Sequence, residues 1–158
     1  MKIIQKNIFF HEIDTNKIVN STVILDIDGT LMCSSQRQIS KCVIDKVRAL
    51  EKNNTVYIFS NNYNTKRNKV IAKSIEVAYI KAPHKKPNKK IMKYIKETCP
   101  VVIVGDKYLT DGLFAQFIGA SHIRVKRYKC KEDSLWDVFA CAFDDACYFF
   151  VKLLRIAK

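Results

Sequence analysis

Short runs of β-branched and aromatic residues alternate along this chain with longer stretches that have the 3.6-residue period of a helix. The candidate strands are residues 23–25, 55–59, 77–80, 101–104 and 123–125. The candidate helices are residues 39–52, 65–74, 87–98 and 110–118, with Pro87 in a first helical turn. Strands joined by helix-length crossovers are typical of a parallel sheet covered on both faces. We therefore predict an α/β chain with a three-layer, Rossmann-like parallel sheet of about five strands.

The length of 158 residues fits a single domain. Its core is expected over about residues 7–131, followed by an amphipathic helix over about 133–158. The chain has room for one helix between Asp28 and Ser60, and for one helix and one strand between Ser60 and Lys86. No cap domain is therefore inserted, and a site at this edge of the sheet is expected to be open.

Polar residues follow three of the predicted strands, at the end where ligands bind in parallel sheets. The three segments are Asp26-Ile27-Asp28-Gly29-Thr30, Ser60-Asn61-Asn62 and Gly105-Asp106. The spacing of Asp26 and Asp28 directs both carboxylates the same way, and Asp106 is expected beside them. Oxygen-only ligands favour a hard ion such as Mg²⁺. Each segment alone is also an ordinary turn or loop, but their joint occurrence at strand ends favours a metal site.

These segments resemble, in order, the four motifs of the haloacid dehalogenase (HAD) superfamily of phosphohydrolases. The resemblance covers about residues 7–125, and it rests on Asp26-Ile27-Asp28-Gly29-Thr30-Leu31, Ser60-Asn61, Lys86-Pro87 and Gly105-Asp106-Lys107-Tyr108-Leu109-Thr110-Asp111. Within the superfamily the chain is most similar to the small class III group that contains the YqeG-like proteins and the phosphatidylglycerophosphate phosphatases. Further support for this group comes from Asn7-Ile8-Phe9-Phe10, Lys66-Arg67 and His84-Lys85-Lys86-Pro87.

The resemblance implies a covalent mechanism. Asp26 would be the nucleophile that forms an aspartyl phosphate, and Asp28 the acid that protonates the leaving alcohol and later the base that activates water. Mg²⁺ would be held by the Asp26 carboxylate, the Asp28 backbone carbonyl and Asp106. Thr30 and Asp111 would contact these groups rather than the substrate, with Asp111 as a partner of the metal or of Lys86. Asp111 is also suited to capping the helix predicted over residues 110–118, and both roles stay open.

Phosphate binding is assigned by the same resemblance to Ser60, Asn61 and Lys86, with Lys86 also serving in catalysis. Two alternatives stay open. Ser60-Asn61-Asn62 is also suited to capping the following helix. Lys85 competes with Lys86, because lysines crowd residues 81–96 without an intervening acid.

The formal net charge of +13 implies a negatively charged partner or substrate. An open site suits a phosphate on a large carrier, and the resemblance favours a lipid headgroup such as that of phosphatidylglycerophosphate. The alternatives are a nucleic-acid end, a phosphoprotein, and a catalytically silent module that binds anionic lipid or RNA. A module that only binds lipid or RNA has no use for a nucleophile and its acid partner, so the motifs disfavour this alternative. The sequence indicates no obligate protein partner.

The predicted helix over residues 133–158 is amphipathic, with an apolar stripe that includes Trp136, Phe139, Phe143 and Phe150. Charges interrupt it too often for a spanning helix. Two roles stay open: it covers the sheet as a last core helix, or it lies in the interface of a membrane.

The six cysteines are expected to be free thiols in a reducing, intracellular compartment, because no signal peptide and no CxxC pair occur. The resemblance points to the mitochondrion, with peripheral membrane attachment as an option. The first twenty residues contain no Arg but include Glu12 and Asp14, which argues against a strong mitochondrial presequence.

Overall fold

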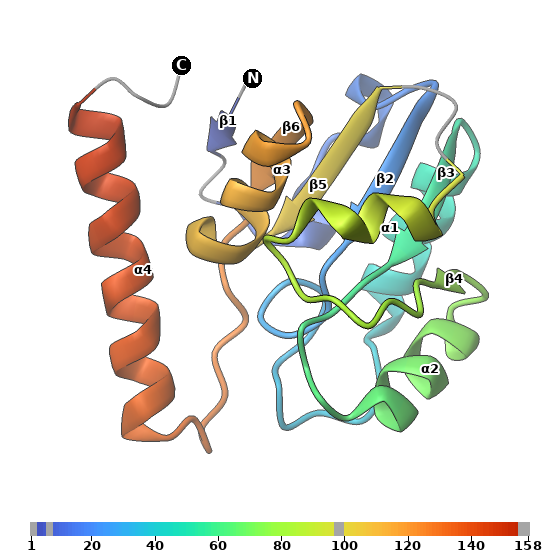
Figure 1. Ribbon diagram of the computed structural model, residues 1–158. Helices are drawn as coiled ribbons and strands as arrows, with labels where there is room; N and C mark the ends of the chain where they lie inside the picture. The colour runs from blue at the N-terminus through green and yellow to red at the C-terminus, as the bar shows by residue number, and fades with distance from the viewer. Residues whose placement is uncertain (1–2, 6–7, 97–99, 155–158) are drawn as a thin grey trace.

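The computed structural model describes residues 3–5, 8–96 and 100–154 (Figure 1). In chain order the elements are β1 (Ile3–Gln5), the short 3-10 helices η1 (Phe10–Glu12) and η2 (Thr15–Lys17), β2 (Ser21–Leu25), α1 (Lys41–Glu51), β3 (Asn54–Ile58), α2 (Thr65–Ser74), β4 (Ala78–Tyr79), the 3-10 helix η3 (Lys89–Tyr94), β5 (Val101–Gly105), the π-helix η4 (Tyr108–Gly112), α3 (Leu113–Phe117), β6 (Ser121–Arg124) and α4 (Leu135–Leu153).

The strands form one six-stranded sheet in the order β1-β6-β5-β2-β3-β4, and all pairs are parallel. This confirms the α/β, Rossmann-like prediction and the five predicted strands. The sixth strand, β1, is added at one edge beside β6. The strand order reverses on either side of β2, which lies between β5 and β3, so the polar residues after these three strands meet at one edge.

The sheet is buried on both faces, and its side chains alternate between two apolar clusters. Val23 and Leu25 of β2 join a cluster with residues of α1 and α2, whereas Ile24 joins a second cluster with residues of η3 and α3. Helix α1 buries Val43, Val47 and Leu50, whose spacing places them on one face of a helix. The alternation confirms a three-layer arrangement, in which neither face of β2 is exposed.

The helix predicted over residues 87–98 is wrong in type and extent. Residues 89–94 form a 3-10 helix, the Asn88 side chain accepts a hydrogen bond from Lys90 N, and Pro87 lies before the helix rather than in its first turn. Residues 97–98 lie outside the described part of the chain. Residues 87–96 are rich in lysine and have no acidic residue to form stabilising pairs with i+4 neighbours, which disfavours a regular α-helix.

The expectation of six free thiols is also wrong, because Cys33 and Cys130 form a disulfide. Their sequence separation is 97, and their Cα atoms lie 5.4 Å apart only because the fold brings the loop after β2 beside the segment before α4. Cys42, Cys141 and Cys147 are free. Cys99 lies outside the described residues.

The amphipathic helix predicted over residues 133–158 is confirmed as α4 (Leu135–Leu153), with residues 155–158 outside the described part of the chain, but neither face covers the sheet. Figure 1 shows α4 running along one side of the molecule, apart from the sheet. Its buried residues are Asp144 and Tyr148, from the side that carries its polar residues. No helix in the described ranges is long and apolar enough to cross a membrane.

Candidate active site

Three buried aspartates come together at the edge of the sheet where β2 and β5 end. Asp26 follows β2, Asp106 follows β5, and Asp111 lies in η4, one turn further along. Each offers a carboxylate oxygen, and these oxygens lie within 4.8 Å of one another. The pairing of β2 with β5 explains why Asp26 and Asp106 are adjacent, as the winding of such sheets predicts.

Lys86 lies at the centre of this cluster. Its Nζ donates to Asp26 Oδ1 at 2.7 Å, to Asp111 Oδ1 at 2.6 Å and to the Phe59 carbonyl at 3.1 Å. The side chain is 1% exposed, so its charge is neutralised by these carboxylates rather than by water. Lys85 instead places its ammonium group over the Tyr63 ring. Of the two lysines that the sequence left open, Lys86 is therefore the one beside Asp26.

Burial raises the pKa of Asp26 to about 8, and the negative charges of Asp111 and Asp106 add to this rise, whereas Lys86 opposes it. Burial alone would lower the pKa of Lys86, but Asp111 and Asp26 together raise it above its ordinary value. The lysine is therefore a permanent cation at neutral pH. Asp26, by contrast, needs additional positive charge before it is fully ionised at neutral pH.

Asp106 is held by Thr30 and Arg127. Thr30 Oγ1 donates to Asp106 Oδ1 at 3.3 Å, and Arg127 Nε donates to Asp106 Oδ2. Burial raises the pKa of Asp106, and the Arg127 guanidinium offsets part of that rise. The predicted support by Thr30 therefore corresponds to a direct hydrogen bond to one of the expected metal ligands.

Two glycines allow the carboxylates to approach the backbone. Gly29 has a φ of 83°, and a Cβ atom there would lie 2.6 Å from Asp106 Oδ2. At Gly105 a Cβ atom would lie 2.2 Å from the Cγ of Asp111. Any larger residue at either position would displace a carboxylate of the cluster.

The Asp28 carboxylate points to a different set of partners. Ser60 Oγ and Asn62 Nδ2 donate to Asp28 Oδ2 at 3.3 and 3.0 Å. Arg67 Nη2 forms an ion pair with Asp28 Oδ1 at 2.9 Å. Asp28 is thus more exposed than Asp26, with 21% of its side chain accessible, and it is connected through Arg67 to the first turn of α2.

Asn61 fixes the backbone that carries Lys86. Its Oδ1 accepts from Lys86 N at 2.8 Å, and its Nδ2 donates to the Lys86 carbonyl at 2.9 Å. The side chain of Asn61 therefore positions the lysine, and only its backbone N–H is left for the predicted phosphate contact. Ser60 Oγ also accepts from Asn62 N at 3.1 Å, which agrees with a turn-forming role for this segment.

The cluster fits a divalent cation. Three carboxylates, Asp26, Asp106 and Asp111, are accompanied by two cations, Lys86 and Arg127, so one negative charge is left when all three are ionised. Burial is the main cause of the raised pKa of Asp26, and the neighbouring carboxylates Asp111 and Asp106 raise it further, so a bound cation would favour the ionised form of this carboxyl. An oxygen-rich, negatively charged group of this kind suits Mg²⁺. Asp28 could contribute its backbone carbonyl, since its carboxylate faces Arg67.

Sequence reasoning missed two contacts in this region. Arg67 was noted only as part of the resemblance, although its position in the first turn of α2, after Ser60-Asn61-Asn62, would have indicated its reach toward Asp28. Arg127 carries no local signal, because it lies in an irregular segment after β6 and reaches Asp106 only through the fold.

A parallel α/β sheet with carboxylates after β2 and β5, a hydroxyl after β3 and a buried lysine between them defines a phosphatase of the haloacid dehalogenase type. The mitochondrial PGP (phosphatidylglycerophosphate) phosphatase family matches residues 4–128, well over half of the chain. The chain belongs to this family, and it is a hydrolase that acts on phosphoric monoesters. The family is mitochondrial, as the resemblance predicted. No curated protein and no solved structure matches the chain.

Proposed function

We propose that this chain hydrolyses a phosphomonoester through an aspartyl phosphate on Asp26, with Mg²⁺ as cofactor and the headgroup of phosphatidylglycerophosphate as substrate. The observation that carries the proposal is the buried contact of Asp26 with Lys86, beside Asp106 and Asp111. A solvated surface carboxylate would need no such neutralisation. A buried carboxyl with a raised pKa and a fixed cation is typical of a catalytic site.

Asp26 is the nucleophile in this proposal, and Asp28 is the proton donor to the leaving alcohol. In the first step the bond from Asp26 to phosphorus forms while the bond from phosphorus to the alcohol oxygen breaks, and Asp28 protonates that oxygen. In the second step Asp28 takes a proton from water, which attacks phosphorus and releases inorganic phosphate from Asp26. The contact of Asp28 with Ser60 and Asn62 keeps its carboxyl at the rim of the site, where a leaving group and water have access.

Lys86 and Ser60 provide positive charge and a donor for the phosphoryl oxygens. Lys86 is already charged and oriented by Asp111, so little rearrangement is needed when charge spreads over these oxygens in the transition state. Asn61 keeps the lysine in place through its two hydrogen bonds to the Lys86 backbone.

Asp26, Asp106 and the Asp28 backbone carbonyl would hold Mg²⁺, with Thr30 and Asp111 supporting them. The ion would neutralise the substrate dianion and the nucleophile, which otherwise repel each other. The fit rests on the acidic cluster and on the raised pKa of Asp26, which burial and the neighbouring carboxylates Asp111 and Asp106 cause.

The lipid headgroup is favoured over other phosphate carriers by family membership, and the net charge of +13 suits any anionic carrier. The same charge and the open site leave a nucleic-acid end or a phosphoprotein as the second candidate. A screen separates them: Mg²⁺-dependent phosphate release is measured side by side from phosphatidylglycerophosphate, a nucleotide, a 5′-phosphorylated oligonucleotide and a phosphoprotein.

The screen includes the Asp26→Asn variant and a sample with chelator as controls. We expect the lipid phosphate to be the preferred substrate, with release abolished in both controls. Preference for the oligonucleotide or the phosphoprotein would refute the lipid substrate and leave the mechanism standing. Release that persists with chelator or in the variant would refute the mechanism.

A further inference from the structure

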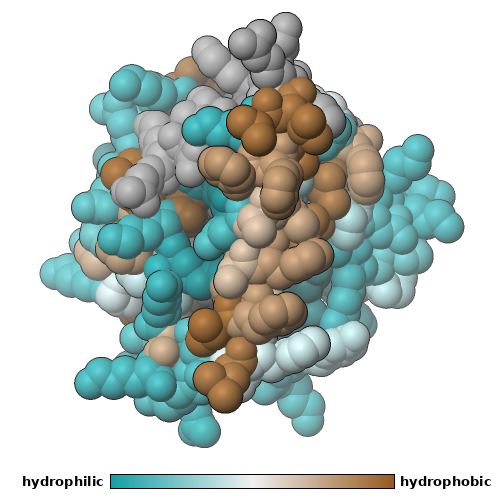
Figure 2. All heavy atoms as spheres, turned by 90° about the vertical axis from the view of Figure 1, so that its left-hand side faces the viewer, coloured by the Kyte–Doolittle hydropathy of each residue, from teal (hydrophilic) through white to brown (hydrophobic). Residues whose placement is uncertain are grey.

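The outward side of α4 is the largest exposed apolar feature of the described part of the molecule. Fourteen large apolar side chains are exposed in the described part of the molecule, and nine of them belong to α4 or to the residue that ends it. These nine are Leu135, Trp136, Val138, Phe139, Phe143, Phe149, Phe150, Leu153 and Leu154. Figure 2 shows them as a hydrophobic band along the face of the molecule, with hydrophilic residues on either side. A monomer in water rarely exposes so continuous a band without a partner for it.

The inward side of α4 is held by polar contacts rather than by an apolar core. Asp144 accepts hydrogen bonds from Tyr108 N at 2.8 Å and Leu109 N at 2.7 Å, and it pairs with Arg124 at 2.9 Å. The Tyr148 ring packs against the Arg124 guanidinium. These contacts attach α4 to η4, the element that carries Asp111. The residues of α4 that are buried against the fold are therefore Asp144 and Tyr148, and its large apolar side chains stay exposed.

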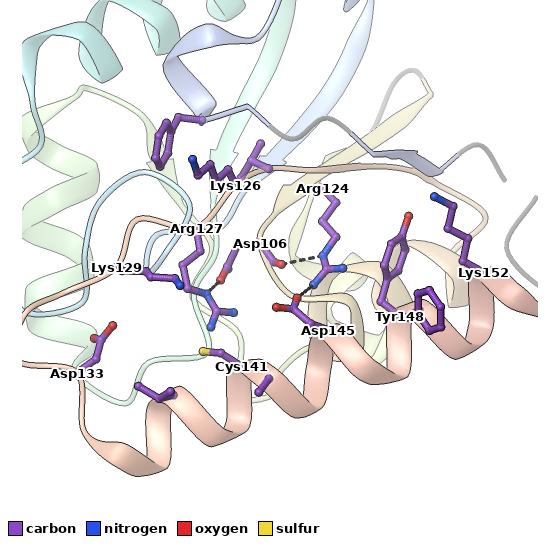
Figure 3. A pocket seen from close by; sticks show the side chains of 15 residues that line it. Asp106, Arg124, Lys126, Arg127, Lys129, Asp133, Cys141, Asp145, Tyr148 and Lys152 are labelled. Atoms are coloured by element: carbon purple, nitrogen blue, oxygen red, sulfur yellow. Dashed lines mark hydrogen bonds and ion pairs between the residues drawn. The ribbon is translucent and has the colours of Figure 1, made fainter.

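A groove of about 830 Å³ lies between α4 and the segment that follows β6. Its lining includes five basic residues, Arg124, Lys126, Arg127, Lys129 and Lys152, and three aspartates. Figure 3 shows Arg124 and Arg127 between α4 and the segment that follows β6, with Lys126 and Lys129 on that segment and Lys152 further along α4. Asp106 of the candidate active site lies in the same groove. Basic side chains therefore lie between the apolar band on α4 and the candidate active site.

We propose that α4 and this groove form a docking surface for an anionic lipid bilayer, with the aromatic side chains of α4 in the interface and the basic groove facing the headgroups. The proposal rests on the proposed function, since it says how a phosphate on a lipid reaches the candidate active site, of which Asp106 is part. A helix with aromatic residues on one side and basic residues beside it is typical of interfacial binding. Helix α4 lies beyond the residues that the family match covers, so family membership does not itself assign this role.

A bilayer suits this surface better than a second copy of the chain does. Two copies would each bring a formal charge of +13 to the contact, whereas an anionic membrane complements that charge. The charged residues of α4 exclude a spanning arrangement for this helix and are compatible with one that lies flat.

Trp136 reports directly on docking, because it is the single tryptophan of the chain and its residue exposure is 74%. Its emission is recorded while vesicles are added, either of phosphatidylcholine alone or of phosphatidylcholine mixed with phosphatidylglycerol. We expect a blue shift, and quenching by lipids with brominated acyl chains, with the mixed vesicles. Both effects should weaken at high salt because the attraction is screened.

The decisive variant carries Phe139→Ser and Phe143→Ser, and the matched control is Phe117→Ser, an exposed phenylalanine on α3. The double variant should bind mixed vesicles at least about tenfold more weakly, since two aromatic side chains no longer enter the interface. It should lose activity on lipid phosphate in vesicles but keep activity on a soluble aryl phosphate. The control should match the wild type in all three measurements, and circular dichroism should show both variants folded.

Unchanged vesicle binding by the double variant would overturn the proposal. A blue shift of Trp136 that depends on protein concentration without vesicles would overturn it in favour of self-association. Failure of the proposed function is distinguishable, because then the wild type hydrolyses neither substrate while its vesicle binding can still be measured.

Discussion

Lys86 shows how the site depends on single side chains. It is 1% exposed and contacts both Asp26 and Asp111 within 2.7 Å, so its buried charge is stabilised by these two carboxyls rather than by water. Removing the lysine would leave the buried carboxyls without their cation, which is far more costly than the loss of a surface ion pair. Substitutions that keep the shape of a side chain but change its charge, such as Asp to Asn, are therefore the best way to test effects on activity apart from effects on folding stability.

Asp26→Asn should abolish turnover and leave the fold intact. At neutral pH the Asp26 carboxyl, with a pKa of about 8, already favours its neutral form when no metal is bound, and an amide mimics that form. Lys86 keeps its ion pair with Asp111. We expect activity to fall roughly 10³-fold or more, with a change in stability below about 2 kcal/mol. Steady-state kinetics and thermal unfolding test this, and a variant that unfolds or remains active would contradict it.

Asp28→Asn should impair hydrolysis in a way that depends on the leaving group. Alkyl phosphates need a proton on the departing oxygen, whereas aryl phosphates leave as stable phenolates. We expect a loss of about 10²–10⁴-fold for an alkyl substrate and a clearly smaller loss of the first step for an aryl substrate. Single-turnover release of the two alcohols makes the comparison. Equal losses would count against the acid role of Asp28.

His122 on β6 should make stability fall in acid. Burial lowers the pKa of His122 to about 4, with Asp111 opposing and Arg124 and Lys86 adding to the effect. Below the ordinary pKa of 6.5 the unfolded chain binds a proton that the folded chain does not, so stability decreases as pH falls from about 6.5 to 4. The loss is on the order of 3–4 kcal/mol. In the His122→Leu variant, denaturant titrations should show no such decrease in the free energy of unfolding between pH 6.5 and 4. The same decrease in the variant as in the wild type would show that another group causes it.

Among the elements, those with strong periodicity were predictable from sequence and those that depend on local polar contacts were not. The predicted bounds of α2, 65–74, match the structure, because its capping residue Asn64 and its apolar spacing agree. Residues 89–94 deviate because Asn88 caps a tighter helix there. The edge strand β1 was missed, since its pairing with β6 joins opposite ends of the family-matched region.

Asp144 should matter to α4 and η4 together, while its neighbour Asp145 should not. Asp144 is buried and bonded to two backbone N–H groups and to Arg124, whereas the Asp145 side chain is 71% exposed. Asp144→Ala should destabilise the fold by about 3–5 kcal/mol, because Arg124 loses its buried partner. Asp145→Ala should cost less than about 1 kcal/mol. Urea unfolding of the two variants measures this difference. Equal losses in the free energy of unfolding would contradict the claim that Asp144 attaches α4 to η4.

At the scale of the whole molecule, the sequence predicted which residues meet at the sheet edge but not how they are neutralised. Asp26, Asp28, Ser60 and Asp106 follow strands, so their common edge follows from the topology. The assignment of Lys86 over Lys85 needed the fold, because adjacent lysines in a basic segment carry the same local signal. The disulfide between Cys33 and Cys130 needed it too, since nothing local relates residues with a separation of 97.

Trapping of the phosphorylated enzyme is the most direct test of the proposed mechanism. The Asp28→Asn variant is mixed with an aryl phosphate and Mg²⁺, because its second step should be slow, and the acid-quenched protein is treated with borohydride. An acyl phosphate is reduced to an alcohol, so peptide mass spectrometry should find homoserine at position 26, and only when both substrate and Mg²⁺ are present. An unmodified Asp26 in a sample that has released its phenol, or a label on any other residue, would contradict the aspartyl-phosphate mechanism.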